Sequence, residues 1–223
     1  MMLQIPSVLD KFRLRKVKDL LDKAQFVDGK LSAGMAAKSV KNNEEVASSD
    51  AQVSQLNNIV MGSLVSNPMF KQAALPYRVA APFYARYRPG MTYGDHVDDP
   101  IMGKSEYYRS DVSITVFLNQ VDEYEGGELV IHTAFGEQKV KLAAGDALVY
   151  PSASLHHVAE VTTGERIVAV TWVQSMIRDA AKRELLYGLN EARETLLRQN
   201  PEAQESKQVD ISYANLFRMW AEV

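Results

Sequence analysis

The sequence predicts an α+β fold in which helices at both ends flank a strand-rich centre. Apolar residues recur at helical spacing near the N-terminus and again after Trp172, whereas the region between consists of short segments rich in β-branched and aromatic residues. Glycine, proline and acidic residues interrupt that region at near-regular intervals. Many short strands with regular turns are typical of a sandwich or jelly roll.

Two helices are expected before the strands. Val8–Ala24 carries an apolar stripe at spacings of three and four, which predicts an amphipathic helix, although Lys16 interrupts the stripe. Phe26–Lys30 contains Asp-Gly and is expected to turn. Ser49–Ser66 again shows apolar residues at helical spacing, so a second helix is expected there.

Eight strands are expected in the centre, separated by turns that contain glycine, proline or acidic residues. Their expected bounds are Val79–Tyr87, Thr92–Val97, Val112–Leu118, Glu128–His132, Glu137–Leu142, Asp146–Tyr150, Leu155–Val161 and Arg166–Gln174. Because the segment Thr162–Glu165 is short and contains glycine, the last two strands are expected to form a tight hairpin.

The pattern becomes helical again at the C-terminal end. Arg178–Gln199 is expected to be a helix with leucines along one side, Pro201–Val209 a polar loop, and Ile211–Trp220 a final apolar stretch. These apolar side chains need a surface, so we expect them to dock on the outer face of the sheet or on a second copy in a homodimer. The chain is therefore expected to be one structural unit, with a helical region at 1–78, a jelly-roll core at 79–175 and a helical extension at 176–223.

Composition excludes several classes of protein. The net charge of −3 and the pI near 5.9 give no electrostatic reason to expect binding to nucleic acid or to an anionic membrane. No apolar run approaches the ~20 residues that span a bilayer. The chain has no cysteine, which excludes disulfides and thiolate metal sites. Met1–Pro6 does not read as a secretory signal, so a cytoplasmic location is expected.

A histidine and a carboxylate two residues apart, His96 and Asp98, are the most informative pair in the chain. On an extended segment they point to the same face, because strand side chains alternate. His156 follows sixty residues later, and Arg166 ten residues after that. Two imidazoles and one carboxylate that converge suit non-haem Fe(II) with open coordination positions. An arginine fork can hold a carboxylate bidentately, so iron with a dicarboxylate co-substrate is the chemistry expected.

The second histidine ligand has two adjacent candidates, because only one of His156 and His157 can face the metal if both lie on a strand. The ten-residue offset to Arg166 favours His156, and His157 is then expected at the surface or at the pocket entrance. His132 lies in an expected strand and is interpreted as structural. An isolated His-x-Asp would more often be an ordinary surface pair where a loop meets a strand.

Several strings resemble the PKHD-type hydroxylases, which are bacterial relatives of the prolyl and lysyl hydroxylases. Tyr87–Asp98 resembles the iron-binding segment of that family, and Tyr150–Val158 resembles the segment with the distal histidine in a Leu-His-x-Val pattern that also favours His156. The other matching strings are Gly126–Leu129, Gly145-Asp146, Val27–Gly29, Ala33-Gly34, Val40–Asn43, Trp172–Ser175 and Leu216–Trp220. The resemblance therefore covers essentially the whole chain.

This resemblance implies a double-stranded β-helix core that uses Fe(II), 2-oxoglutarate and O2, with L-ascorbate as a reductant. It implies that Arg166 holds the C5 carboxylate of 2-oxoglutarate. Tyr87 matches the position from which related prolyl hydroxylases present a phenol to the co-substrate, whereas Phe117 stands where some of them have a second tyrosine. Ser113 and Thr115, on the same strand as Phe117, are weaker candidates for contact with the co-substrate. The implied metal ligands are His96, Asp98 and His156.

The reaction implied by the resemblance is hydroxylation of an unactivated C–H bond, with release of succinate and CO2. The expected substrate is a protein, a peptide, or an amino-acid-like or siderophore-like molecule. Two rival interpretations belong to other classes. A cupin-like metalloprotein that does not use 2-oxoglutarate would not need Arg166, and a non-catalytic jelly-roll binding module would not need three aligned metal ligands.

Overall fold

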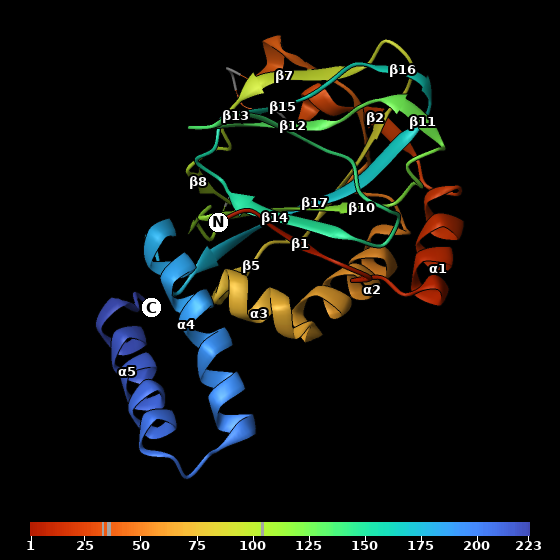
Figure 1. The fold of residues 1–223 in the computed structure, drawn as a ribbon. Helices are drawn as coiled ribbons and strands as arrows, with labels where there is room; N and C mark the ends of the chain where they lie inside the picture. The colour runs from red at the N-terminus through yellow and green to blue at the C-terminus, as the bar shows by residue number, and fades with distance from the viewer. Residues whose placement is uncertain (33, 35–36, 104) are drawn as a thin grey trace.

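Two β-sheets lie face to face in the computed structural model of the protein, which describes residues 1–32, 34, 37–103 and 105–223. Figure 1 shows the smaller sheet above the larger one, with helices beneath the larger sheet. The two inner faces share one buried cluster, which includes Tyr87 and Val168 of the larger sheet with Leu129 and Val158 of the smaller one. Ala33, from one of the matching strings, lies outside the described residues. The predicted α+β jelly roll is confirmed.

The larger sheet is antiparallel and has eight strands in the described part of the chain, in the order β1-β14-β10-β17-β6-β4-β2, with β5 beside β17. Its strands are β1 (Leu3–Ile5), β2 (Phe26–Asp28), β4 (Glu44–Val46), β5 (Pro76–Val79), β6 (Phe83–Tyr87), β10 (Val112–Phe117), β14 (Ala147–Pro151) and β17 (Arg166–Ser175). β17 pairs with β10 on one side and β6 on the other. Its side chains therefore lie in the middle of the sheet.

The smaller sheet has five described strands in the order β13-β12-β15-β7-β3. They are β3 (Lys41–Asn42), β7 (Thr92–His96), β12 (Leu129–Thr133), β13 (Gly136–Val140) and β15 (His156–Val158). Two short ribbons pair β8 (Ile101–Met102) with β9 (Tyr108–Arg109), and β11 (Tyr124–Gly126) with β16 (Val161–Gly164). The register sets His156 directly opposite His96.

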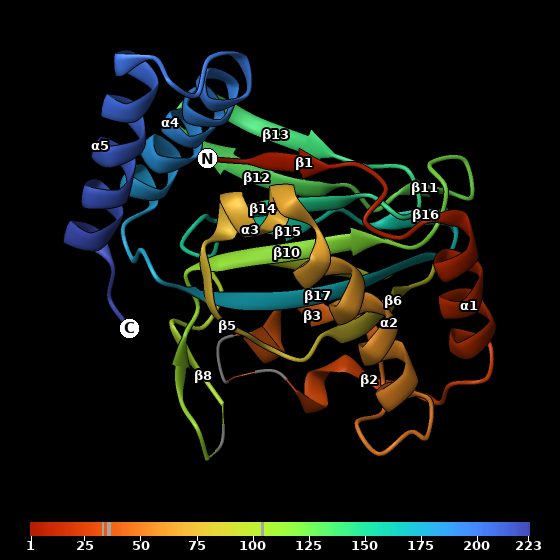
Figure 2. The same ribbon diagram turned by 90° about the horizontal axis from the view of Figure 1, so that it is seen from below.

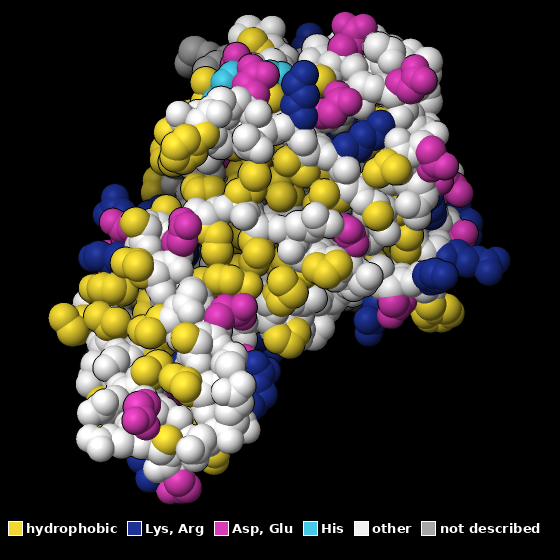
Figure 3. Space-filling view, viewed as in Figure 1, with side chains coloured by type: hydrophobic (Ala, Val, Ile, Leu, Met, Phe, Trp, Pro, Cys, Tyr) yellow, Lys and Arg dark blue, Asp and Glu magenta, His cyan; other side chains and the backbone are white. Residues whose placement is uncertain are grey.

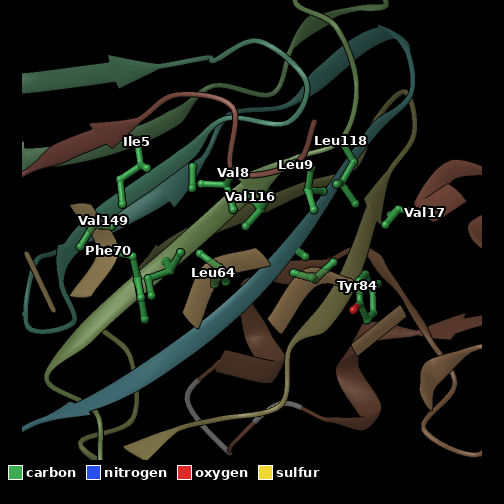
Figure 4. Packing of buried hydrophobic residues seen from close by; sticks show 14 of the residues in the cluster. Ile5, Val8, Leu9, Val17, Leu64, Phe70, Tyr84, Val116, Leu118 and Val149 are labelled. Atoms are coloured by element: carbon green, nitrogen blue, oxygen red, sulfur yellow. The ribbon is translucent and has the colours of Figure 1, made fainter. Parts of the chain in front are cut away.

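Three helices, α1 (Lys11–Leu21), α2 (Val53–Ser66) and α3 (Pro68–Ala74), cover the outer face of the larger sheet (Figures 1 and 2). Figure 4 shows Leu64 and Phe70 from these helices in the same cluster as Val116 and Val149 of the sheet. This cluster is the main apolar core, and it leaves the inner face of the larger sheet to line a site. Two 3-10 turns, η1 (Gly29–Leu31) and η2 (Ala37–Ser39), lie before β3.

The helices α4 (Ala180–Gln199) and α5 (Gln204–Trp220) form a hairpin that projects from the body of the molecule (Figure 1). Its base is a small buried cluster of Leu75, Ile177 and Leu186, against which α5 packs. The buried Arg183 side chain donates to the backbone oxygens of Ile177 and Asp111, which joins α4 to the end of β10. Docking on the outer face of the sheet was one of the two expectations for these helices. The hairpin does not dock there, because α1–α3 already cover that face of the larger sheet. The homodimer stays a prediction.

The expected hairpin between the last two strands is wrong. β15 ends at Val158 in the smaller sheet, and β17 begins at Arg166 in the larger one. Between them the chain crosses from one sheet to the other through β16, which pairs with β11 instead. The turn residues at 162–165 mark that crossing, and their glycine signal alone could not tell a crossing from a hairpin.

Three other local expectations are corrected. Phe26–Asp28 is a strand, because it finds a partner in β4, which the sequence pattern did not reveal. The expected strand Val79–Tyr87 is broken between β5 and β6. α5 begins at Gln204, so most of the expected polar loop Pro201–Val209 is helical. Apart from the buried Ser206, the polar side chains of this helical part face solvent. Among the described residues, no helix is long and apolar enough to cross a membrane.

Candidate metal centre

The pairing of β7 with β15 brings two histidines together. His96 ends β7 and lies opposite His156 at the start of β15, with 4.2 Å between the centres of the two rings. Asp98 follows β7, and its Oδ1 lies 4.0 Å from His156 Nε2. One ligand atom from each of these three residues falls within 4.8 Å of the others. Residues far apart in sequence therefore converge on one point on the inner face of the smaller sheet.

Backbone contacts orient both imidazoles toward that point. His96 Nδ1 lies 2.8 Å from the carbonyl oxygen of Gly94, and His156 Nδ1 lies 2.9 Å from that of Ser154. A carbonyl oxygen can only accept, so each Nδ1 carries a proton and each Nε2 is the ring nitrogen left to bind a metal. Burial, and then the neighbouring His156, lower the pKa of His96 to about 4. His96 is therefore neutral at pH 7, as a metal ligand must be.

Asp98 is held by hydroxyl groups of the larger sheet. Ser113 Oγ on β10 donates to Asp98 Oδ2 and lies 2.8 Å from Ser152 Oγ. One carboxylate oxygen is therefore occupied, and the other faces His156. Ser113 was expected as a weak candidate for co-substrate binding, whereas its contact here is with Asp98. Thr115, two residues further along β10, lines the pocket described below.

Arg166 is the largest of the fully buried side chains in the described chain, with 1 % of its surface exposed. Its guanidinium carbon lies 5.0 Å from the centre of the Tyr87 ring and 5.7 Å from that of Phe117. Among the described residues, neither Nε nor Nη1 has a hydrogen-bond partner. A buried cation with two unpartnered nitrogens is costly, so this guanidinium is prepared for an anionic ligand.

Glycine is required at position 127 to leave room for this arginine. Gly127 has φ +65°, and a Cβ there would lie 3.0 Å from Cδ of Arg166 and 2.9 Å from Cγ2 of Val161. Any other residue would combine a left-handed backbone with a clash against the buried arginine stem. The Gly126-Gly127 string therefore has a physical reason at this site.

A pocket of about 590 Å³ connects the three converging residues with Arg166. Both sheets line it, and the larger sheet contributes inward-facing residues of β6, β10, β14 and β17. Phe83 and Trp172 form an edge-to-face pair on its wall, with ring centres 5.7 Å apart. Although core packing is the stronger expectation from sequence for Trp172 and Met91, Trp172 forms part of the pocket wall. Met91 packs against the cluster shared by the two sheets.

Other polar residues on the pocket wall were missed by the sequence analysis. Tyr93 stacks on His96 with ring centres 3.7 Å apart, and Tyr150 Oη lies 3.4 Å from His156 Nε2. Lys41 and Glu45 form a buried ion pair at 2.5 Å. Strand alternation could have indicated Tyr150, which lies opposite Ser113. The ion pair could not be found in this way, because its strands are two or three residues long.

The two remaining histidines lie elsewhere. His157 follows His156 and points to the opposite, outer face of the smaller sheet, where it contacts Asp95. His132 on β12 contacts the same carboxylate. Neither residue lines the pocket. The structure thus brings His96, Asp98, His156, Arg166 and Tyr87 to one pocket and leaves His132 and His157 outside it.

Comparison with known proteins gives consistent matches. The sequence profile of the 2OG-Fe(II) oxygenase superfamily matches residues 82–174, which span β6 to β17. A PKHD-type hydroxylase of Thioalkalivibrio sulfidiphilus is 52% identical over 224 aligned positions, covering 100% of both chains.

Solved structures with low sequence identity share the fold. HygX from Streptomyces hygroscopicus, solved with nickel, 2-oxoglutarate and hygromycin B bound, has a TM-score of 0.57 at 13% identity, covering 79% of this chain and 84% of that one. A prolyl-4-hydroxylase from Pseudomonas putida has a TM-score of 0.53 at 18% identity, covering 78% of this chain and 92% of that one.

Proposed function

Because this chain belongs to the PKHD-type hydroxylases of the 2OG-Fe(II) oxygenase superfamily, we propose that it hydroxylates an unactivated C–H bond with release of succinate and CO2. Members of this superfamily are oxidoreductases that use Fe(II), 2-oxoglutarate and O2. The single observation that carries the proposal for this chain's own residues is the buried Arg166 guanidinium, whose Nε and Nη1 have no partner among the described residues, in one pocket with His96, Asp98 and His156.

The donor set fits Fe(II). His96 and His156 offer their Nε2 atoms, and Asp98 offers the carboxylate oxygen that Ser113 does not occupy. Two imidazoles and one carboxylate leave open positions on an octahedral metal, as this class of oxygenase requires. These three residues would hold the iron, and Ser113 would hold Asp98 in its orientation.

The pocket also fits 2-oxoglutarate. The planar guanidinium of Arg166 can hold a carboxylate by donating two parallel hydrogen bonds. These bonds would give partners to nitrogen atoms that have none among the described residues. Burial raises the pKa of the Tyr87 phenol, so its proton stays on and can be donated to the same carboxylate. Thr115 lines the same pocket and adds a hydroxyl.

When bound, iron and 2-oxoglutarate supply the oxidising chemistry, and the protein supplies binding, orientation and exclusion of water. Apolar side chains from both sheets, among them Leu129, Val158 and Val168, line the pocket. The buried position of Arg166 makes its attraction for a carboxylate stronger than in water. We propose L-ascorbate as the reductant that keeps the iron in the Fe(II) state.

For the substrate, we propose a protein, a peptide, or an amino-acid-like or siderophore-like molecule. The wall near Phe83 and Trp172 is apolar, and among the described residues the buried indole Nε1–H of Trp172 has no hydrogen-bond partner. An apolar surface beside a free donor suits a group that carries a carbonyl oxygen next to an apolar part. This supports the proposed class and does not choose among its members.

The rival interpretations lack support. A cupin-like metalloprotein that does not use 2-oxoglutarate gives no reason to bury an arginine with two unpartnered nitrogens in the same pocket as the metal ligands. A non-catalytic binding module gives no reason for two imidazoles and an oriented carboxylate that converge on one point.

The test is succinate formation from 2-oxoglutarate by purified protein with Fe(II), O2 and ascorbate, screened against panels of peptides and siderophores. We expect succinate to form, to increase with one class of substrate, and to be lost in Asp98→Ala. The proposal would be contradicted if the protein consumed no 2-oxoglutarate, either in the absence of a candidate substrate or with any of the panels.

A further inference from the structure

The outer face of the smaller sheet carries a second group of potential metal ligands. Asp95 of β7, His157 of β15 and His132 of β12 each offer one ligand atom, and these atoms lie within 4.8 Å of one another. Together with His96 and His156 of the pocket, His132 and His157 account for all four histidines of the chain. Figure 3 shows histidine side chains beside acidic ones at the surface where Figure 1 labels β7 and β13.

Strand register explains why these side chains meet. Asp95 and His157 are the immediate neighbours of His96 and His156, so strand alternation turns them to the opposite face of the sheet. His157 lies opposite Val130 on β12, and His132 is two residues further along that strand, on the same face. The three residues therefore come from the neighbouring strands β7, β15 and β12, and Glu137 of β13 lies directly opposite His132.

The distances between donor atoms fit one metal ion. Asp95 Oδ1 lies 2.8 Å from His157 Nδ1 and 3.2 Å from His132 Nε2. Ligands at ~2.0–2.1 Å from a tetrahedral Zn²⁺ are separated by about 3.3 Å, so small side-chain rotations would admit the ion. Glu137 Oε1 lies 4.0 Å from His132 Nδ1, the ring nitrogen that does not face Asp95, so Glu137 lies behind His132 and is not counted as a ligand.

This group is separate from the candidate iron centre. Its side chains are exposed to solvent, by 56% for Asp95, 31% for His132 and 26% for His157, whereas those of His156 and Asp98 are 5% and 9% exposed. None of the three outer residues lines the pocket. An ion on this face would reach them from solvent and would not displace the iron.

We propose that Asp95, His132 and His157 form a second divalent-metal site of the Zn²⁺ type. The two imidazoles and the carboxylate match the nitrogen and oxygen ligands that Zn²⁺ takes in proteins. A metal there cross-links β7, β12 and β15. Two of these strands, β7 and β15, also carry His96 and His156. An ion bound on the outer face would therefore hold together the strands that position the candidate iron ligands.

The test measures bound Zn²⁺ in the metal-free full chain by equilibrium dialysis at low micromolar free Zn²⁺. We expect two ions per chain in the wild type, because the two imidazoles and the carboxylate of the inner site also suit Zn²⁺. Asp98→Ala should lose the inner ion and keep the outer one, and His132→Ala combined with His157→Ala should do the reverse. Lys139→Ala is the matched control, since it removes a charge two residues from Glu137 without removing a ligand, and it should keep both ions.

A second readout uses thermal unfolding, which does not depend on activity. Adding Zn²⁺ to the Asp98→Ala variant should raise its Tm, and the rise should disappear when His132→Gln is added. One ion per chain in the wild type, or two in the variant that lacks both outer histidines, would overturn the proposal. These outcomes leave the proposed hydroxylase function untouched, because they concern only the outer face.

Discussion

Arg166 lies directly opposite Tyr87 in the register of β17 and β6, and its guanidinium carbon is 5.0 Å from the centre of the Tyr87 ring. Burial raises the pKa of the Tyr87 phenol, and the Arg166 charge opposes that rise. The pair thus presents a permanent cation and a protonated phenol side by side at the inner end of the pocket. The guanidinium and the phenol can both donate hydrogen bonds to one ligand carboxylate.

Replacing the arginine should separate 2-oxoglutarate binding from metal binding. Arg166→Ala should keep the metal but weaken 2-oxoglutarate binding by roughly 2–4 kcal/mol, because the ligand carboxylate loses its buried partner. Arg166→Lys should be intermediate, since it keeps the charge and loses the planar fork. Calorimetric titration with an inert divalent metal in the site measures both; equal affinity in the wild type and Arg166→Ala would favour the cupin-like interpretation.

The phenol should contribute less than the arginine. Tyr87→Phe keeps the ring beside Arg166 and removes only the hydroxyl, so 2-oxoglutarate affinity should fall by about 0.5–1.5 kcal/mol, the range for one hydrogen bond. The same titration measures it. No change in affinity would mean that Tyr87 serves only in packing.

The adjacent histidines should behave differently. His156→Ala should sharply weaken Fe(II) binding at the inner site, whereas His157→Ala should leave it nearly intact, because the two side chains lie on opposite faces of β15. Fe(II) binding measured anaerobically in the presence of 2-oxoglutarate reports the inner site alone. Loss with His157→Ala and not with His156→Ala would show that the wrong histidine was assigned.

Ser113 should affect the metal through Asp98. Ser113→Ala removes the hydroxyl that donates to Asp98 Oδ2 and should lower metal affinity roughly 10–100-fold, as expected for a group that orients a ligand. Ser113→Thr keeps a hydroxyl and should restore part of the affinity. An unchanged metal affinity in Ser113→Ala, with the fold intact by circular dichroism, would contradict this role.

The C-terminal extension should be needed for stability. Leu186→Ala should cost about 2–5 kcal/mol in the free energy of unfolding, because Leu186 is buried against Leu75 and Ile177. Its exposed neighbour provides the control, since Leu185→Ala should change stability little. A chain that ends at Ser175 loses this cluster and should be insoluble or strongly destabilised. A soluble, monomeric and active truncated protein would make the extension dispensable and favour a separate role in partner binding.

The parts of the fold with a strong local pattern were predictable from sequence. β10, β14 and β17 are long or rich in β-branched residues, and α2 and α4 have clear apolar spacing. The strands β1 to β4 have two or three residues each, so too few positions alternate to give a pattern. The crossing between β15 and β17 depends on which strand each partner finds, and turn residues do not encode that.

Strand alternation and the family resemblance predicted part of the site. Alternation placed His96 and Asp98 on one face, and the resemblance pointed to His156, Arg166 and Tyr87. The contacts of Ser113 with Asp98, and of Tyr93 with His96, depend on how the two sheets stack and on ring orientation. A single sequence does not specify those distances.

The most direct test of the central claim is an anaerobic absorption titration of the Fe(II)-loaded protein with 2-oxoglutarate. If His96, Asp98 and His156 hold the iron in the same pocket as Arg166, the wild type should develop the visible charge-transfer band of a 2-oxo acid bound to Fe(II). Asp98→Ala should give no band, and Arg166→Ala should give it only at much higher 2-oxoglutarate concentration. A wild-type protein that binds Fe(II) and shows no band at saturating 2-oxoglutarate would contradict the account.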